Sequence, residues 1–302
     1  MTAAGAVKAS ELGVVLPHEH VFVDLTREYR GDGLLNDLDA AVAELTDFVD
    51  QGGGAIVDCT TRGLHPEPQR VAEAAASAGV HVILGTGYYR DPYLKSDWMD
   101  PASVRAIADR LVADATEGFE GTSLKAGIIG EIGSDREYVS AAEERSFRAA
   151  ARAHLDTGLA ITTHAARWPV GHAQLDILEH EGVDPRLVIV GHCDTVPLPE
   201  YHLSIAARGA YVQFDTIRSG SRFDLENRVK WVLNLIEHGH AERILLSHDV
   251  CLASHLRVRG GGGYTLLMRD FLPRLRDAGV DDELIETITV RNPQRALVAG
   301  RS

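Results

Sequence analysis

The segment LAITTHAARWPVGHAQLDILEHEGVDPRLVIVGH, residues 159–192, decides the predicted fold. Two short apolar runs, 159–164 and 187–192, each end in a histidine, and a helical pattern that stops near Gly182 lies between them. A strand, a helix and a second strand in this order pair in parallel through a right-handed crossover. His164 and His192 are therefore expected at the same, carboxyl end of their strands.

The same alternation runs through the rest of the chain. Further apolar, β-branched runs occupy residues 14–25, 55–60, 80–87, 124–132, 210–214 and 244–250, with amphipathic helical patterns between them. About eight such units close a barrel. We predict one α/β domain over residues 1–302, a (β/α)₈ TIM barrel. An open, doubly wound sheet is the alternative fold.

Composition and charge limit the partners. The formal net charge is −14 and no long Lys/Arg track occurs, which disfavours nucleic acid. The three cysteines are far apart and odd in number, as in a reducing compartment. Neither a signal peptide nor a long apolar span is apparent, so a cytoplasmic location without membrane contact is expected. The expected partner is a small-molecule substrate, and a homodimer is left open.

Polar side chains recur at the ends of the predicted strands. His18 and His20 are two residues apart on the first strand, so both imidazoles point to one side. Taken singly, each residue is more often a hydrogen-bonded structural residue than a ligand. Together they would be costly to bury without a compensating ion. The predicted ligand set at the carboxyl-terminal mouth is His18, His20, Glu131, His164, His192 and Asp249.

This ligand set is too large for one catalytic zinc, which keeps an open position. The six side chains divide naturally over two divalent ions that share a carboxylate. Imidazole and carboxylate suit zinc best, with manganese, cobalt or iron as alternatives. Such two-metal sites generate hydroxide near neutral pH.

With this ligand set, the chain resembles the phosphotriesterase-like branch of the amidohydrolase superfamily. Within that branch it is most similar to the phosphotriesterase homology proteins. The likeness spans nearly the whole chain. It rests on LPHEHVFVDL (16–25), KAGIIGEIG (125–133), VGHCD (190–194), GAYVQFDTI (209–217), LLSHDVC (245–251) and RNPQRAL (291–297).

The resemblance implies how the ligands divide. His18 and His20 would bind the more buried ion with Asp249, and His164 and His192 the more exposed one. Many members bridge the ions with a carboxylated lysine, whereas this chain offers Glu131.

Lys125 is the other residue of the fourth predicted strand with a side chain that could form a bridge. It lies six residues before Glu131, roughly 20 Å away along a strand, which is too far from the mouth. Members with the lysine place it one position earlier, at Gly130 here. A bulge near Gly130 is therefore required for Glu131 to face the same way.

Other residues carry weaker expectations. Tyr88 and Tyr89 follow the third strand and Arg218 lies after the seventh, where each could contact substrate or simply belong to a surface loop. Asp249 is expected to accept a proton in catalysis as well as to bind metal. His248 should turn away from Asp249 and serve structure.

The predicted function is hydrolysis of a small ester, lactone or phosphoester by metal-bound hydroxide, with lactone or carboxylic ester favoured. A TatD-like metal-dependent deoxyribonuclease is the first alternative, because that family shares the His-x-His start and a Gly-Glu-Ile-Gly run like residues 130–133. A non-catalytic barrel that binds only ligand or metal is the second.

Overall fold

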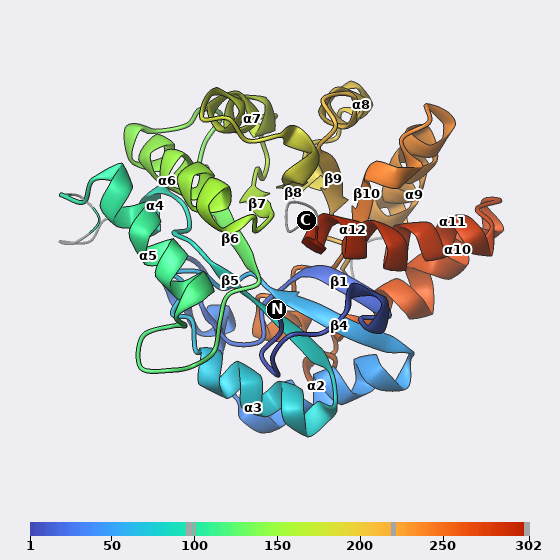
Figure 1. Ribbon diagram of the computed structural model, residues 1–302. Coiled ribbons are helices and arrows are strands. Elements are labelled where there is room, and N and C mark those ends of the chain that lie inside the picture. Colours follow the sequence, from blue (N-terminus) through green and yellow to red (C-terminus); the bar gives the residue numbers. More distant parts are fainter. Residues whose placement is uncertain (95–98, 100, 219–221, 299–302) are drawn as a thin grey trace.

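A computed structural model of the chain describes residues 1–94, 99, 101–218 and 222–298. Eight parallel strands form one sheet in the order β1-β4-β5-β6-β7-β8-β9-β10, which curls into a nearly closed barrel inside a ring of helices (Figure 1). The strands are β1 (Val14–Glu19), β4 (Gly53–Asp58), β5 (His81–Thr86), β6 (Ile128–Gly133), β7 (Ile161–His164), β8 (Val188–Gly191), β9 (Tyr211–Phe214) and β10 (Ile244–Leu246). The predicted TIM-barrel fold is confirmed.

Alternation along each strand divides the core into two layers. Side chains such as Val15, Ile128 and Leu245 point inward and fill the barrel. Their neighbours, such as Leu16 and Ile129, point outward and pack beneath the helices. Apolar side chains thus lie on both faces of the sheet, which explains the near-continuous hydrophobic runs of the sequence.

The connecting helices cover the outer face of the barrel. They begin at polar caps where the sequence offers them: the side chains of Asp37, Ser103 and Ser140 accept hydrogen bonds from the first turns of α2, α5 and α6. Gly79 and Gly158 end α3 and α6 in the left-handed conformation. The main helices are α2 (Leu38–Asp50), α3 (Pro68–Ala78), α5 (Val104–Thr116), α6 (Ala141–Thr157), α7 (Gly171–His180), α8 (Pro199–Ala207), α9 (Arg222–Glu237), α10 (Leu272–Asp277), α11 (Asp282–Glu286) and α12 (Asn292–Val298).

Most predicted runs are longer than the observed strands, and three of them differ most from the structure. The run 14–25 divides into β1 and a short strand β2 (Val23–Asp24), which pairs with β3 (Leu34–Leu35) outside the barrel. The run 124–132 becomes a strand only at Ile128, and the run 244–250 ends as a strand at Leu246. In each case the residues beyond the strand belong to loops, and two of these loops carry predicted ligands.

The sheet order ends at β10 and β1, and polar groups bridge this seam. The backbone N–H of Asp249 donates to the carbonyl of His18 at 3.2 Å, and the N–H of His18 donates to Oγ of Ser247 at 3.1 Å. The first and last strands are thus joined at the end of the barrel where the ligands lie.

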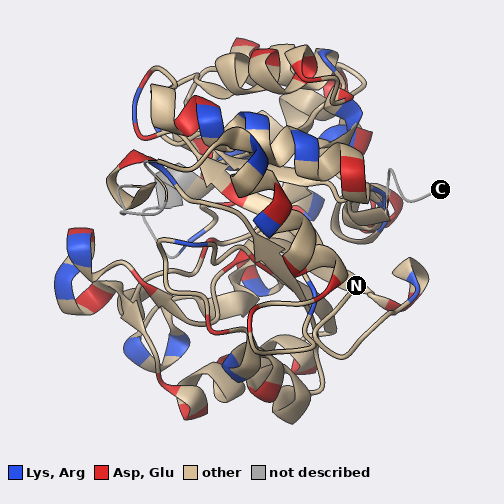
Figure 2. Ribbon diagram, turned by 60° about the vertical axis from the view of Figure 1, so that its left-hand side comes forward, with Lys and Arg blue, Asp and Glu red and all other residues tan. Residues whose placement is uncertain are grey.

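Charged residues of both signs are interspersed over the outer helices (Figure 2). Among the described residues, no helix is long and apolar enough to cross a membrane.

Candidate metal centre

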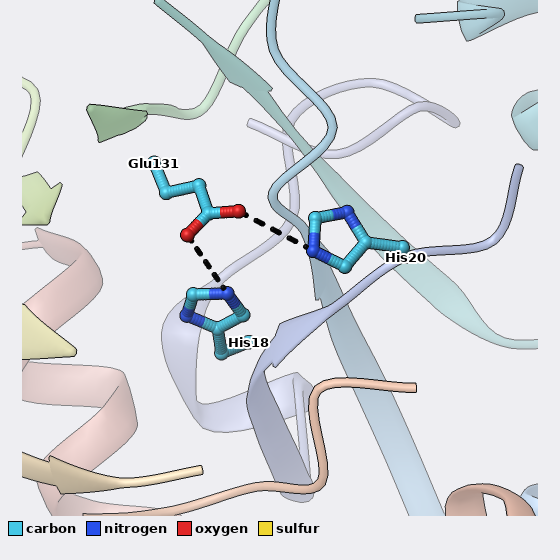
Figure 3. Close-up of side chains that lie close together, drawn as sticks. All are labelled: His18, His20 and Glu131. Atoms are coloured by element: carbon cyan, nitrogen blue, oxygen red, sulfur yellow. Dashed lines mark ion pairs between the residues drawn. The ribbon is translucent and has the colours of Figure 1, made fainter. Parts of the chain in front are cut away.

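Glu131 of β6 lies at the centre of the predicted ligand set. Its Oε1 is 3.4 Å from Nε2 of His20, and its Oε2 is 3.4 Å from Nε2 of His18 (Figure 3). The same Oε2 lies 3.0 Å from Nδ1 of His164 and 3.3 Å from Nε2 of His192. One buried carboxylate therefore faces both pairs of histidines.

An irregularity in β6 turns Glu131 toward the mouth. The register between β6 and β7 shifts between Ile129 and Ile132, as the sequence requires of a bulge near Gly130. Gly130 has φ +121° and precedes a cis peptide bond to Glu131. A Cβ at position 130 would collide with the carbonyl oxygen of Thr162, so no side chain fits there. The bridging group of this chain can come from residue 131 and cannot come from residue 130.

The two histidines of β1 are oriented by partners on their outer nitrogens. The Thr60 hydroxyl donates to the carbonyl of Phe22 at 3.2 Å, so its oxygen accepts from Nδ1 of His20 at 2.9 Å and leaves Nε2 free for the site. Nδ1 of His18 lies 3.0 Å from the side-chain amide of Gln213. Nε2 of His18 is buried without a hydrogen-bond partner among the described residues.

The second pair of histidines follows β7 and β8. Asp215 accepts hydrogen bonds from Nδ1 of His192 at 2.7 Å and from its backbone N–H, so the imidazole presents Nε2 to Glu131. His192 sits in the left-handed region at φ +56°, which is unfavourable for a residue with a side chain. His164 instead presents Nδ1, which also contacts the hydroxyl of Tyr89 at 3.3 Å.

Asp249 enters the site from the loop after β10. Its Oδ1 lies 3.3 Å from Nε2 of His20 and 3.9 Å from Nε2 of His18. Asp249 also has a positive φ, +53°. Arg218 pairs with the other oxygen, Oδ2, through its Nη2 and donates from Nε to the carbonyl of His248 at 2.9 Å.

The buried carboxylate of Glu19, the last residue of β1, holds this loop in place. Oε1 of Glu19 accepts from Oγ of Ser247 at 2.8 Å, and from the backbone N–H and Nδ1 of His248 at 2.8 and 2.9 Å. Oε2 accepts from the N–H of Val250 at 2.8 Å. Nε2 of His248 accepts from the N–H of Leu267 at 2.9 Å. The structural role predicted for His248 is thus supported by contacts on both of its ring nitrogens.

The buried carboxylates and imidazoles of the cluster shift one another's pKa values. Burial alone would raise the pKa of Glu131, but the imidazoles of His18 and His164 lower it well below its ordinary value. Burial alone would lower the pKa of His20, but hydrogen bonds to Asp249 and Glu131 raise it to about 10. Burial and the neighbouring imidazole of His192 lower the pKa of His164 to about 4. The carboxylates thus favour positively charged neighbours, which protonated imidazoles or bound cations can provide.

Divalent ions would provide positive charge beside these carboxylates, with neutral imidazoles as further ligands. The unpartnered Nε2 of His18 and the mixed imidazole and carboxylate donors fit such an ion. The sets His18–His20–Glu131 and Glu131–His164–His192 each bring their ligand atoms within 4.8 Å of one another. A further set contains Asp215, but its oxygens already accept from His192 and Gln213, so we assign it an orienting role.

A cavity of about 230 Å³ opens over the cluster, lined by ligands His20, Glu131, His164, His192 and Asp249. Tyr89 and Arg218 line it as predicted. Tyr88 is absent from the described lining; its buried ring lies under the guanidinium of Arg62, 5.6 Å away. The cavity lining expected of Tyr88 is therefore not observed among the described residues, because adjacent residues of an extended segment point to opposite sides.

Sequence reasoning missed three supporting residues: Glu19, Thr60 and Asp215. Asp215 carried a usable signal, because it follows the seventh predicted strand directly, as the ligands follow theirs. Glu19 also carried a usable signal, because it is a carboxylate in an apolar strand and lies between two histidines. Thr60 carried no such signal.

Comparison with known proteins agrees with this geometry. The Phosphotriesterase homology protein of Escherichia coli is 34% identical over 290 residues, covering 94% of this chain and 97% of the relative. Its crystal structure, with phosphate in the active site, superposes with a TM-score of 0.92 over 95% of this chain and 99% of that chain, at 34% identity. A lactonase from Listeria monocytogenes superposes with a TM-score of 0.92 at 25% identity, covering 98% of both chains.

The N-acetyltaurine hydrolase of Dictyostelium discoideum is 31% identical over 275 residues, covering 87% of this chain and 74% of the relative. The Phosphotriesterase family profile matches residues 1–297. This match and the relatives cover nearly the whole chain, and we conclude that the protein belongs to the phosphotriesterase family.

Proposed function

We propose that this metal-dependent hydrolase holds two divalent ions and cleaves a small carboxylic ester, lactone or phosphoester. The observation that carries the proposal is the position of Glu131, whose two oxygens face separate histidines of one cluster. His18, His20 and Asp249 would hold the more buried ion, His164 and His192 the more exposed one, and Glu131 would be shared. Zinc suits these donors best, with manganese, cobalt or iron as alternatives.

When bound, the two ions would lower the pKa of a water molecule and polarise the scissile carbonyl or phosphoryl oxygen. Asp249 is the residue placed to take a proton, because its Oδ1 faces the cluster while Arg218 holds Oδ2. Although burial would raise the pKa of Asp249, Arg218 and His20 keep it well below the usual range. The carboxylate is therefore ionised, and its role as proton acceptor rests on its position beside the cluster.

The cavity favours a small substrate. Its volume of about 230 Å³ lies below that of typical drug-sized pockets. Leu25, Leu64 and Leu252 form an apolar part of the lining. These dimensions and the net charge of −14 weigh against the alternative of a TatD-like deoxyribonuclease.

Relatives suggest which bonds to test first. One similar structure is named a lactonase and one relative an N-acetyltaurine hydrolase, so lactones and an amide belong beside esters in the panel. Protein reconstituted with zinc, manganese or cobalt should cleave a 4-nitrophenyl ester, a γ-lactone or a 4-nitrophenyl phosphotriester, and chelator-treated protein should not. N-acetyltaurine and single-stranded DNA complete the panel.

The outcomes separate the candidate functions. Turnover of the ester, lactone or phosphotriester that is lost in Glu131→Ala supports the proposal. Cleavage of DNA alone would replace it with the nuclease. An intact metal content without turnover of any panel member would favour a barrel that binds metal or ligand without catalysis.

A further inference from the structure

Three arginines line the cavity, and they differ in their ion-pair partners. Nη1 of Arg90 pairs with Asp135, and its Nη2 pairs with Glu28 at 2.5 Å. Arg218 pairs with Asp249. The guanidinium of Arg167 forms no ion pair with any described residue, although Arg167 lines the same cavity. Arg167 is thus the lining cation that retains capacity for an anion.

The backbone presents Arg167 in a defined place. Its φ is +71°, in the left-handed region that residues with side chains rarely adopt. The N–H of Arg167 donates to Oγ of Thr195 at 2.7 Å, and this hydroxyl donates to the carbonyl of the ligand His192 at 2.7 Å. These hydrogen bonds fix the backbone of Arg167 relative to the predicted ligand His192, so the side chain starts from a defined point beside the cavity.

The distance to the metal cluster is short. Arg167 follows the ligand His164 by three residues, so their Cα atoms are at most about 11 Å apart. Arg167 is exposed and lines the cavity that also contains His164 and Glu131, so a group bound by its guanidinium would share this cavity with the cluster. The apolar lining from Leu25, Leu64 and Leu252 remains for the rest of the substrate.

We propose that Arg167 binds an oxyanionic substituent of the substrate, a carboxylate or a sulfonate, and so selects small anionic esters over neutral ones. This inference rests on the proposed hydrolase function and adds its substrate class. The planar guanidinium can bind either anion through two parallel hydrogen bonds. In a protein with a net charge of −14, such a local cation would offset the general repulsion of an anion.

The test uses esters that differ in charge. The acyl-side set is 4-nitrophenyl hydrogen succinate, 4-nitrophenyl 3-sulfopropanoate and neutral 4-nitrophenyl pentanoate. The alcohol-side pair is 2-carboxyethyl acetate and neutral butyl acetate, followed by pH-stat. Metal-loaded wild type is compared with Arg167→Met, Arg167→Lys and the control Arg105→Met, which removes an exposed arginine of α5 that pairs with Asp109.

In Arg167→Met, KM for the anionic member of at least one set should rise about tenfold, with kcat changed less than about twofold. Values for the neutral members and for Arg105→Met should stay within about twofold. Arg167→Lys should recover part of the loss. Raising the ionic strength should raise the wild-type KM for the anion and leave that of Arg167→Met nearly unchanged.

The two proposals fail separately. If wild type cleaves neutral esters and Arg167→Met leaves every anionic KM unchanged, the anion site is wrong and the hydrolase stands. Sensitivity to the succinate alone or to the sulfonate alone identifies which anion is bound. Absence of turnover of every ester here, and of the lactone and phosphotriester of the first panel, in protein that carries its metal, overturns both proposals.

Discussion

Glu19 of β1 accepts hydrogen bonds from both the backbone N–H and Nδ1 of His248, at 2.8 and 2.9 Å, across 229 residues of sequence. The same carboxylate accepts from Ser247 and Val250, so it grips the loop on both sides of Asp249. The hydrogen bonds of buried Glu19 thus determine where the predicted ligand Asp249 lies.

We expect Glu19→Gln to weaken metal binding, although Glu19 is not itself a predicted ligand. The amide turns one acceptor oxygen into a donor that faces other donors, which costs about 1–3 kcal/mol of folding free energy. Loss of an orienting partner typically weakens metal affinity about 10–100-fold. Denaturant unfolding and metal titration measure both effects. Glu242→Gln, which changes an exposed carboxylate paired with Arg295, is the matched control; equal behaviour of the two variants would refute the clamp.

Metal content is the most direct measurement. The six clustered ligands should hold close to two transition-metal ions per chain after reconstitution with zinc, manganese or cobalt. Elemental analysis of desalted protein counts them. A reproducible value of one or fewer would contradict the binuclear centre.

Glu131→Ala should lose at least one ion and nearly all activity, because the oxygens of Glu131 face Nε2 of His18, His20 and His192 and Nδ1 of His164, whereas Asp215 contacts His18 and His192 through their Nδ1 atoms. Reactivation of metal-free wild type should be independent of added bicarbonate, since a glutamate needs no carbon dioxide to become anionic. Bicarbonate-dependent recovery would instead point to a carboxylated lysine, and retention of both ions by Glu131→Ala would place the bridge elsewhere.

Asp249→Asn keeps the size of the side chain and removes the proton acceptor. We expect kcat to fall about 10²–10⁴-fold. Elemental analysis of the same samples, at saturating metal, separates this effect from loss of an ion. A variant with full metal and a kcat near that of wild type would exclude Asp249 as the acceptor.

Asp215→Asn should act on metal binding more than on turnover. Asp215 orients His192 through Nδ1 and lies behind the ligand, so the variant should bind metal about 10–100-fold more weakly. Saturating metal should restore most of kcat, in contrast to Asp249→Asn. Competition with a chelator of known affinity gives the binding constant, and an unchanged constant would leave Asp215 without its assigned role.

Much of this arrangement was predictable from local pattern. The ligands follow apolar runs, and parallel strands bring the ends of those runs together, so His164, His192 and Glu131 could be placed in advance. The irregularity at Gly130 was implied by the family resemblance, because members with the lysine place it one residue before Glu131. The period-two alternation of a strand is enough for such inferences.

The rest depended on contacts that no local pattern encodes. Glu19 finds its partners 228 to 231 residues away. Asp249 adopts a left-handed backbone beyond the end of β10, where strand alternation no longer applies. Whether Tyr88 or Tyr89 faces the cavity depends on the turn after β5, and the two could not be separated by sequence alone.

The seam between β1 and β10 also has a consequence for how the protein is made. A nascent chain that has emerged only as far as β9 already carries His18, His20, Glu131, His164 and His192, but it lacks the loop that Glu19 grips and the carboxylate of Asp249. Capture of a full complement of ions must therefore wait for nearly the whole chain to leave the ribosome. An ion held by His18, His20 and Asp249 would connect β1 to the loop after β10, so the metal-loaded barrel would open at this seam only with loss of metal.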